Sequence, residues 1–205
     1  MKKFTRETGI GAVMMLDNVD TDQIIPGHMM MKVGTQGFGD GLFANWRYKA
    51  DGSNNPDFVL NRPPFDEALF LVAGHNFGCG SSREHAVWAI RDFGIRAIIA
   101  PSFGAIFMRN CYNNGLLPLV LPEEEVAALS KALTEQGAEM SIDLEDMRVV
   151  SPDGRVTGFT LSDIDRQRLL GGLDQIGVTL LRDDKIEEYQ RLDHLRRPWV
   201  YDVPG

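Results

Sequence analysis

Apolar residues gather in three short runs in the middle of the chain. Each run has the length of a buried strand, and the segments between the runs have the periodicity of helices. The three runs cover residues 68–73, 95–100 and 116–121. An order of strand, helix, strand, helix, strand predicts a parallel βαβαβ core with right-handed crossovers.

The helix boundaries in this core are predicted from their end signals. The first helix is expected over 82–93, where apolar residues share one face and Gly94 follows. The second is expected to start at Ser102 as N-cap, to run to about Asn113 and to be ended by Gly115. A third, over 123–136, has acidic residues in its first turn, where the helix dipole favours them.

The flanking segments are less regular. A first strand is expected over 9–16, and the stretch 51–64, rich in Gly, Asn and Pro, predicts a loop with one short strand around 58–60. From about residue 140 we expect a C-terminal extension. Its elements are a hairpin of 140–150 with 155–161, a helix capped by Ser162 and ending at Gly171, and a last helix from Asp183 or Asp184 to about Leu195. Together these elements predict a single α/β domain over 1–205.

Composition and charge exclude several classes of function. The 205-residue chain has 21 Lys and Arg against 29 Asp and Glu, a net charge of −8, and no basic stripe indicates a nucleic-acid partner. No apolar run approaches the roughly 20 residues that a membrane span needs. The basic N-terminal residues precede an apolar stretch interrupted by Glu7, Gly9 and Gly11, so we expect no signal peptide. We therefore expect a cytoplasmic protein.

The segment most informative about function joins the first buried strand to the first helix. Residues 74–85 read Gly-His-Asn-Phe-Gly-Cys-Gly-Ser-Ser-Arg-Glu-His. Backbone N–H groups at a helix N-terminus lack partners, and the helix dipole favours a negative ligand there. Arg83 adds a planar guanidinium that can bind a carboxylate through two hydrogen bonds. We therefore expect a small acid or phosphate to bind here.

The same segment also fits purely structural interpretations. Ser81 with Glu84 matches a capping box, in which the serine is the N-cap and the glutamate bonds back to it. Gly78 and Gly80 could form only a tight turn. A two-glycine turn without the third glycine is weak evidence for a dinucleotide site.

Two cysteines, Cys79 and Cys111, limit the metal chemistry of the chain. They lack the spacing of a zinc site, and an iron–sulfur cluster needs three or four thiolates, so we expect no metal site here. Cys79 with His75 or His85 would suit a cysteine nucleophile, but a small buried thiol in the turn is favoured. We expect Cys111 to lie in the core and His85 to pack or to hydrogen-bond between domains.

Three long motifs resemble, in their order, the signature motifs of the aconitase superfamily. They are Asp17 to Pro26, Asn76 to His85, and a third that starts at Ile99 and ends at Pro118. With further matches within 38–61 and at 172–180, nearly the whole chain is similar to the small-subunit family of bacterial 3-isopropylmalate dehydratases. The resemblance implies a three-layer β/β/α swivelling domain of the aconitase C-terminal type. It also implies a hydro-lyase that moves a hydroxyl group between adjacent carbons of a hydroxy acid.

The resemblance assigns catalytic roles within the second motif. Ser81 is implied to be the base that removes a C–H proton, with its alkoxide stabilised by backbone N–H groups and by Arg83. Ser82 is implied to bind a substrate carboxylate. Glu84 is expected to be a capping partner rather than an acid catalyst.

The first motif is implied to line the cleft near the serine. Thr21 and Asp22 would contact the substrate, unless the polar segment 20–23 is only a turn that satisfies local backbone groups. The loop that follows is implied to contact the variable part of the substrate. It has no arginine, so its apolar side chains favour the isopropyl group of an alkylmalate over a third carboxylate, although the methionines would equally suit core packing. Its candidate residues are His28, Met29, Met30 and Met31, with Lys32 expected to face outwards.

The resemblance also implies a cofactor and a partner outside this chain. In the family the Lewis acid is one iron of a [4Fe–4S] cluster, which we expect on a large iron–sulfur subunit that binds this chain. The implied reaction interconverts 2- and 3-isopropylmalate in leucine biosynthesis. Two other functions stay open: a small subunit acting on a related alkylmalate, such as 2-methylmalate with citraconate, and a non-catalytic carboxylate-binding or regulatory module.

Overall fold

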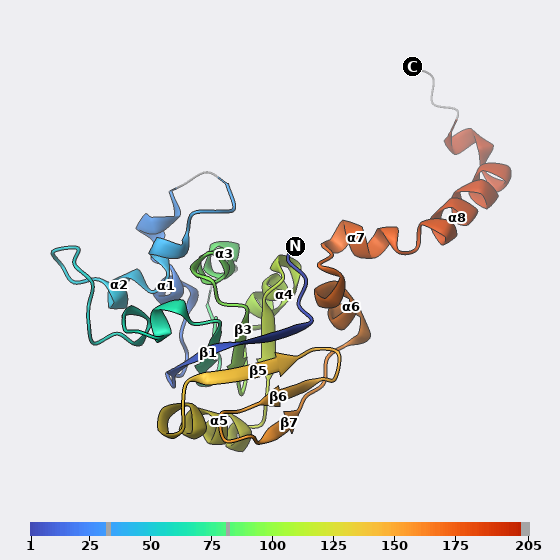
Figure 1. Cartoon of the computed structure of the whole chain (residues 1–205). Coiled ribbons are helices and arrows are strands. Elements are labelled where there is room, and N and C mark those ends of the chain that lie inside the picture. The colour runs from blue at the N-terminus through green and yellow to red at the C-terminus, as the bar shows by residue number, and fades with distance from the viewer. Residues whose placement is uncertain (32–33, 81–82, 202–205) are drawn as a thin grey trace.

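The computed structural model describes residues 1–31, 34–80 and 83–201. Its sheet has seven strands in the order β4-β3-β2-β1-β5-β6-β7 (Figure 1). The strands are β1 (Arg6–Met14), β2 (Phe70–Ala73), β3 (Ala97–Ala100), β4 (Leu117–Val120), β5 (Glu139–Asp143), β6 (Arg148–Val150) and β7 (Val156–Gly158). The helices are α1 (Thr21–Ile24), α2 (Ala44–Arg47), α3 (Glu84–Phe93), α4 (Ala105–Asn114), α5 (Glu123–Glu135), α6 (Asp163–Gly171), α7 (Gln175–Leu180) and α8 (Asp183–Arg196).

The three strands β2, β3 and β4 are parallel, and α3 and α4 connect them along the chain. Nearly all residues of these strands are buried, as expected for parallel strands that are covered on both faces. The predicted βαβαβ core is confirmed.

The strand β1 joins the two halves of the sheet. Its residues 11–14 pair in parallel with β2, whereas its residues 6–10 pair antiparallel with β5. The strands β5, β6 and β7 continue as an antiparallel meander, which runs across the direction of the parallel strands in Figure 1. One strand therefore belongs to both a parallel and an antiparallel arrangement.

Two hydrophobic cores lie on opposite faces of the parallel strands. Leu71 and Ala73 of β2 belong to the first, together with residues of α3 and of the N-terminal segment such as Ile24. Phe70 and Val72 belong to the second, which α5 and the antiparallel strands cover. The alternation of side chains along a strand thus builds a helical layer, a parallel layer and an antiparallel layer. The predicted α/β class is confirmed.

One predicted strand outside the core was wrong, and another is divided in two. The predicted strand at 58–60 is replaced by a 3₁₀ turn, Val59–Asn61, because the Asn61 amide donates to the carbonyl oxygens of Arg47 (2.6 Å) and Asn55 (2.9 Å) and folds the segment back. The stretch 140–150 forms two strands instead of one. The Asp143 carboxylate accepts hydrogen bonds from two backbone N–H groups of the reversing turn, Glu145 and Asp146.

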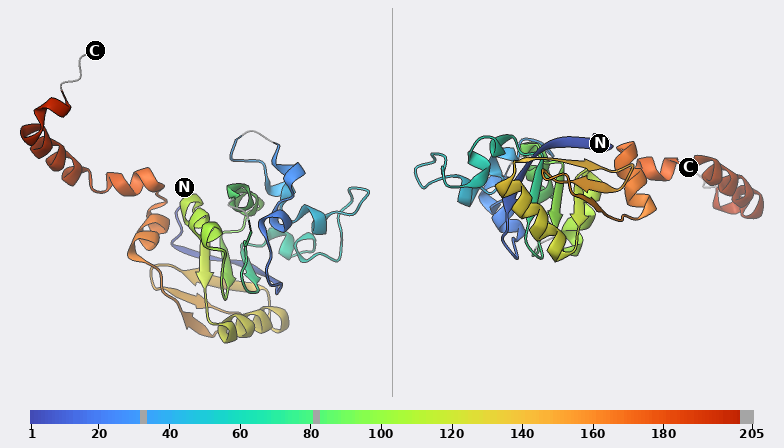
Figure 2. Two further views of the ribbon diagram at one scale, coloured as in Figure 1. Left: turned by 180° about the vertical axis from the view of Figure 1, so that it is seen from behind. Right: turned by 60° about the horizontal axis from the view of Figure 1, so that its bottom comes forward.

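The last two helices leave the body of the molecule in every view (Figures 1 and 2). The helices that start after Ser162 and at Asp183 are confirmed, whereas α7 between them was not predicted. We call residues 174–201 the arm. Within it, Asp193 alone is buried. Of the helices in the described part of the chain, none has both the length and the apolar character required to cross a membrane.

Candidate active site

The first two signature motifs lie side by side at the carboxyl end of β2. The Asp17 carboxylate accepts from the His75 N–H at 2.7 Å, and the Asn18 N–H donates to the His75 carbonyl oxygen at 2.8 Å. Farther along the loop, the Gly78 N–H donates to the Val19 carbonyl oxygen at 2.7 Å. These bonds hold the start of α1 against the glycine-rich loop.

The third motif meets the same loop from the other side. The Ser102 hydroxyl oxygen accepts from the Asn76 N–H at 2.8 Å, and the Gly104 N–H donates to the Phe77 carbonyl oxygen at 2.9 Å. Ser102 therefore positions the loop. The prediction that Ser102 caps the next helix was wrong. That helix, α4, begins at Ala105 with Gly104 as its N-cap.

Two glycines allow the loops to approach so closely. Gly78 has φ +72°, and a Cβ atom there would lie 2.2 Å from the Phe107 ring. A Cβ atom on Gly104 would lie 2.5 Å from the carbonyl oxygen of Gly78. Only residues without a side chain fit this crossing. It leaves an open hollow of about 300 Å³ between the loop and the N-terminus of α4.

Arg83 and Asp22, predicted from separate motifs, form an ion pair. Arg83 is the N-cap of α3, and its side chain is about one-third exposed, whereas that of Asp22 is 61% exposed. Thr21 precedes Asp22 in α1 but is buried. Ser81 and Ser82, the predicted base and carboxylate-binding residue, lie outside the described residues.

Glu84 does not take part in a capping box. It is the first residue of α3, and its carboxylate accepts from the Asn114 amide of α4 at 2.7 Å. The Asn114 oxygen accepts in turn from the Trp88 indole at 3.0 Å. The predicted capping box is therefore wrong, because Arg83 is the N-cap of α3 and Glu84 lies at the first position of the helix rather than the third.

The methionine loop does not present one uniform apolar surface. Residues Gly27–Met30 form a 3₁₀ turn in which Met29 and Met30 pack against the first core. Met31 is 85% exposed, and His28 is also exposed. Core packing, one of the two interpretations, therefore holds for Met29 and Met30. Met31 and His28 face outwards instead. Lys32 is not among the described residues.

Cys79, His75 and His85 each contact other groups, and not one another as a cysteine–histidine nucleophile would require. Cys79 is half-buried rather than buried, because its turn lies at the surface, and its thiol faces the Asn18 carbonyl oxygen at 3.5 Å. His75 pairs with Glu123 at 3.3 Å. His85 packs against the rings of Phe38 and Trp88, which confirms its expected packing role.

Cys111 lies in the core as predicted, and burial raises the pKa of its thiol. Within residues 1–31, 34–80 and 83–201, no three His, Cys, Asp or Glu side chains are arranged to hold a metal ion. One thiol in a surface turn and one inside α4 do not fit a [4Fe–4S] cluster.

Two site residues were missed by sequence reasoning. Asn18 and Asn76 both have φ +56°, and the Asn76 amide donates to the Asn18 side-chain oxygen at 2.9 Å. The pair links the first two motifs. The available signal was residue type, since asparagine adopts the left-handed region more readily than other residues with side chains.

The sequence and the fold of this chain are both similar to those of known proteins. Residues 1–124 match the family model of the aconitase C-terminal domain. A 3-isopropylmalate dehydratase small subunit from Cupriavidus necator is 51% identical, over 98% of this chain and 99% of the relative. One from Mesorhizobium japonicum is 48% identical, over 98% of this chain and 100% of the relative. A crystal structure of 3-isopropylmalate dehydratase from Methanocaldococcus jannaschii has a TM-score of 0.66 and 29% identity, covering 91% of this chain and 99% of that one.

Proposed function

This chain belongs to the aconitase C-terminal domain family and, within it, to the small subunits of the hydro-lyase 3-isopropylmalate dehydratase, and from this premise we propose how its own residues serve that reaction. The proposed reaction interconverts 2- and 3-isopropylmalate by dehydration and rehydration. The observation that supports our assignment of residues is the meeting of the three motifs at the glycine-rich loop, where Arg83 pairs with Asp22 of the first motif and Asn76 bonds to Ser102 of the third.

Ser81 is the proposed base. On dehydration it takes the proton from the carbon next to a substrate carboxylate, and on hydration it returns a proton to the alkene. A free serine hydroxyl is a poor base, so its alkoxide needs a positive environment. We propose that Arg83 and the backbone N–H groups before α3 supply it, while Ser82 binds a carboxylate.

Asp22 is proposed to orient the Arg83 guanidinium. A carboxylate that pairs with one edge of the planar group leaves its remaining N–H donors free for the substrate. Thr21, directly before Asp22, is buried. We therefore propose that it fixes the position of α1 and meets the substrate only as part of the wall of the cleft.

Selectivity is proposed to come from the loop at 28–31. A third carboxylate placed beside these residues would lose hydration without a guanidinium to replace it, whereas an isopropyl group would not. Met31 is the described methionine with the most freedom to reach an alkyl branch, because Met29 and Met30 pack against the core.

The cofactor is proposed to reside on a partner. Because the two thiols of this chain do not fit a [4Fe–4S] cluster, we place the cluster on a large subunit that forms a heteromer, such as a heterodimer, with this chain. The names of the relatives as small subunits support such a partner. A cytoplasmic location stays a prediction from the sequence.

The test is reconstitution with the large subunit from the same organism. We expect the mixture to isomerise 3-isopropylmalate and to act poorly on citrate. Ser81→Ala should nearly abolish kcat, and Arg83→Lys should lower kcat/KM by well over tenfold, because lysine lacks the fork. The matched changes Ser53→Ala and Arg148→Lys, in surface segments, should leave both constants unchanged.

Three results would contradict the proposal. Greater efficiency on 2-methylmalate and citraconate would indicate a related hydro-lyase. A complex that turns over no alkylmalate would indicate a regulatory module. Normal kcat in Ser81→Ala would remove the serine from proton transfer.

A further inference from the structure

The arm exposes large apolar side chains but has no core of its own. No residue of α7 is buried, and α8 buries only Asp193. A 14-residue helix is marginally stable in water without tertiary packing. Six of the exposed apolar residues are Ile176, Leu180, Leu181, Tyr189, Leu195 and Trp199. Apolar surface of this extent on a folded chain indicates an interaction site.

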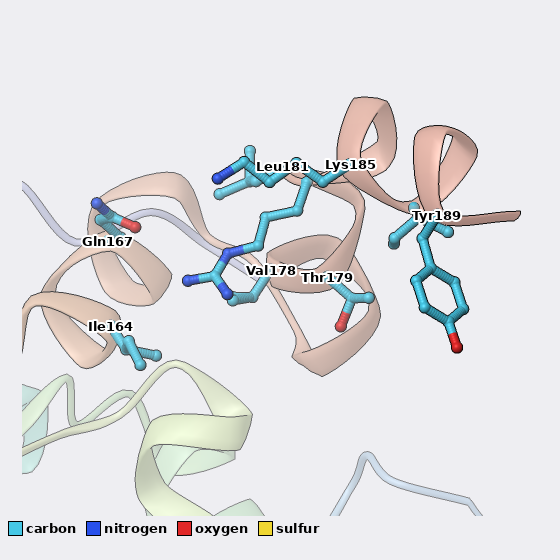
Figure 3. Close-up of a pocket in the computed structure, with 9 residues that line it drawn as sticks. Ile164, Gln167, Val178, Thr179, Leu181, Lys185 and Tyr189 are labelled. Carbon is cyan, nitrogen blue, oxygen red and sulfur yellow. The ribbon is translucent and has the colours of Figure 1, made fainter. Parts of the chain in front are cut away.

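A hollow of about 490 Å³ gives this surface a definite shape. Figure 3 shows side chains from three helices around it, with Ile164 on α6, Val178 on α7 and Tyr189 on α8. Two cations also line it, Arg182 and Lys185, and no acidic residue does so. Within the described chain, neither cation forms an ion pair. The hollow therefore combines an apolar floor with two cationic side chains.

We propose that this hollow binds a segment of the large subunit that carries apolar side chains flanked by carboxylates. The inference rests on the proposed function, which supplies the large subunit as partner. Carboxylates match Arg182 and Lys185, and apolar side chains match the floor. A second copy of this chain fits less well, since each copy carries a net charge of −8.

The extent of the comparisons agrees with this choice. The aconitase C-terminal family model ends at residue 124, well before the arm. The relatives named small subunits align over 98% of this chain and nearly all of their own length. The arm thus belongs to the part shared with separate small subunits, where a surface for holding another chain is needed.

The experiment measures the dissociation constant of the heteromer by sedimentation with the purified large subunit from the same organism. Leu181→Asp should weaken association at least tenfold, because a charge enters the apolar floor. Arg182→Glu combined with Lys185→Glu should weaken it at least tenfold at low salt and less at high salt, because salt screens exposed charges.

Matched controls lie on the other side of the molecule. Val156→Asp changes an equally exposed apolar residue of β7, and Lys131→Glu reverses an exposed charge on α5. Both should leave the dissociation constant within twofold of the parent. The arm buries almost nothing, so its variants should keep the parent's thermal midpoint. Hydrogen exchange of the amides in α7 and α8 should slow when the large subunit binds.

Several outcomes separate this inference from the proposed function. Arm variants that bind with the parent's affinity, or arm amides whose exchange is unchanged in an active heteromer, would overturn the inference alone. An isolated chain that dimerises through the arm, with Leu181→Asp breaking the dimer, would assign the hollow to a second copy and also overturn it. A parent chain that forms no active complex with the large subunit would overturn the proposed function itself.

Discussion

Asp22 and Arg83 illustrate how much depends on a single pair of side chains. They are 61 residues apart in the chain and belong to different motifs, yet they form an ion pair across the site. The pair is substantially exposed, so it contributes little to folding stability. We therefore propose that its main role is to orient the guanidinium.

We predict that Asp22→Asn lowers kcat of the reconstituted enzyme by about tenfold, because the guanidinium loses one charged partner. The thermal midpoint should change little. Asp146→Asn removes a comparably exposed partner of Arg148 on the meander and should leave kcat unchanged. Equal activity of the two variants would show that Arg83 needs no orienting carboxylate.

Gly78→Ala tests the close approach of the loops. The substitution places a Cβ atom in the Phe107 ring at a positive φ, so we expect a loss of unfolding free energy of about 2–3 kcal/mol. Gly52→Ala has a similar φ, +81°, with nothing within 4 Å, and should lose only about 1 kcal/mol. Urea unfolding measures both. Similar losses would mean that backbone conformation alone, without the ring, requires glycine at 78.

At this scale the sequence predicted residue types better than their contacts. Arg83 and Asp22 were each expected to meet substrate, but nothing in the spacing indicated that they meet each other. The same holds for Asn18 and Asn76. Such pairs depend on where two loops cross, which neither hydrophobic periodicity nor a local motif encodes.

Among the elements, α4 carries a pH-dependent part of the stability. Burial raises the pKa of the Cys111 thiol, and burial, followed by the charge of Asp165, raises the pKa of Tyr112. The folded chain thus keeps protons that the unfolded chain releases above about pH 8.5 and about pH 10. Stability from these groups is complete below those values and is lost progressively as pH rises from them towards the raised pKa values of the folded chain.

We predict that the unfolding free energy falls between pH 8.5 and 10 by up to about 1.4 kcal/mol per pH unit for the thiol. In Cys111→Ala the chain should be less stable at pH 7, because a cavity remains, but its slope over this range should be shallower. Urea unfolding at several pH values gives both slopes. Parallel slopes would show that the thiol does not ionise on unfolding in this range.

Element boundaries were predicted where local sequence decides them. Gly94 and Gly115 end α3 and α4 in the left-handed conformation, and Ser162 caps α6. The starts of α3 and α4 were misplaced because Ser102 bonds to the neighbouring loop and Glu84 to the neighbouring helix. Ser102 and Glu84 both have a tertiary partner in place of the expected local one, and a sequence pattern alone could not reveal it.

For the whole molecule, we predict that the isolated chain stays colourless and inactive. Its two thiols lie on different elements, one of them inside the core, so they cannot hold a [4Fe–4S] cluster together. Anaerobic incubation with iron and sulfide, followed by desalting and an absorbance spectrum, checks this. A stable brown species on the parent chain would place the cluster here and contradict the two-subunit proposal.

The double pairing of β1 has a consequence for synthesis of the chain on the ribosome. Ile10 lies opposite Glu139, so the first strand to emerge must wait for a partner made much later. At typical elongation rates the delay is roughly ten seconds. During that time the nascent chain exposes an unpaired strand edge, which favours wrong pairing with other chains. We therefore expect yield during expression to depend on translation speed and on chaperones that shield nascent strands, even though the finished protein needs neither.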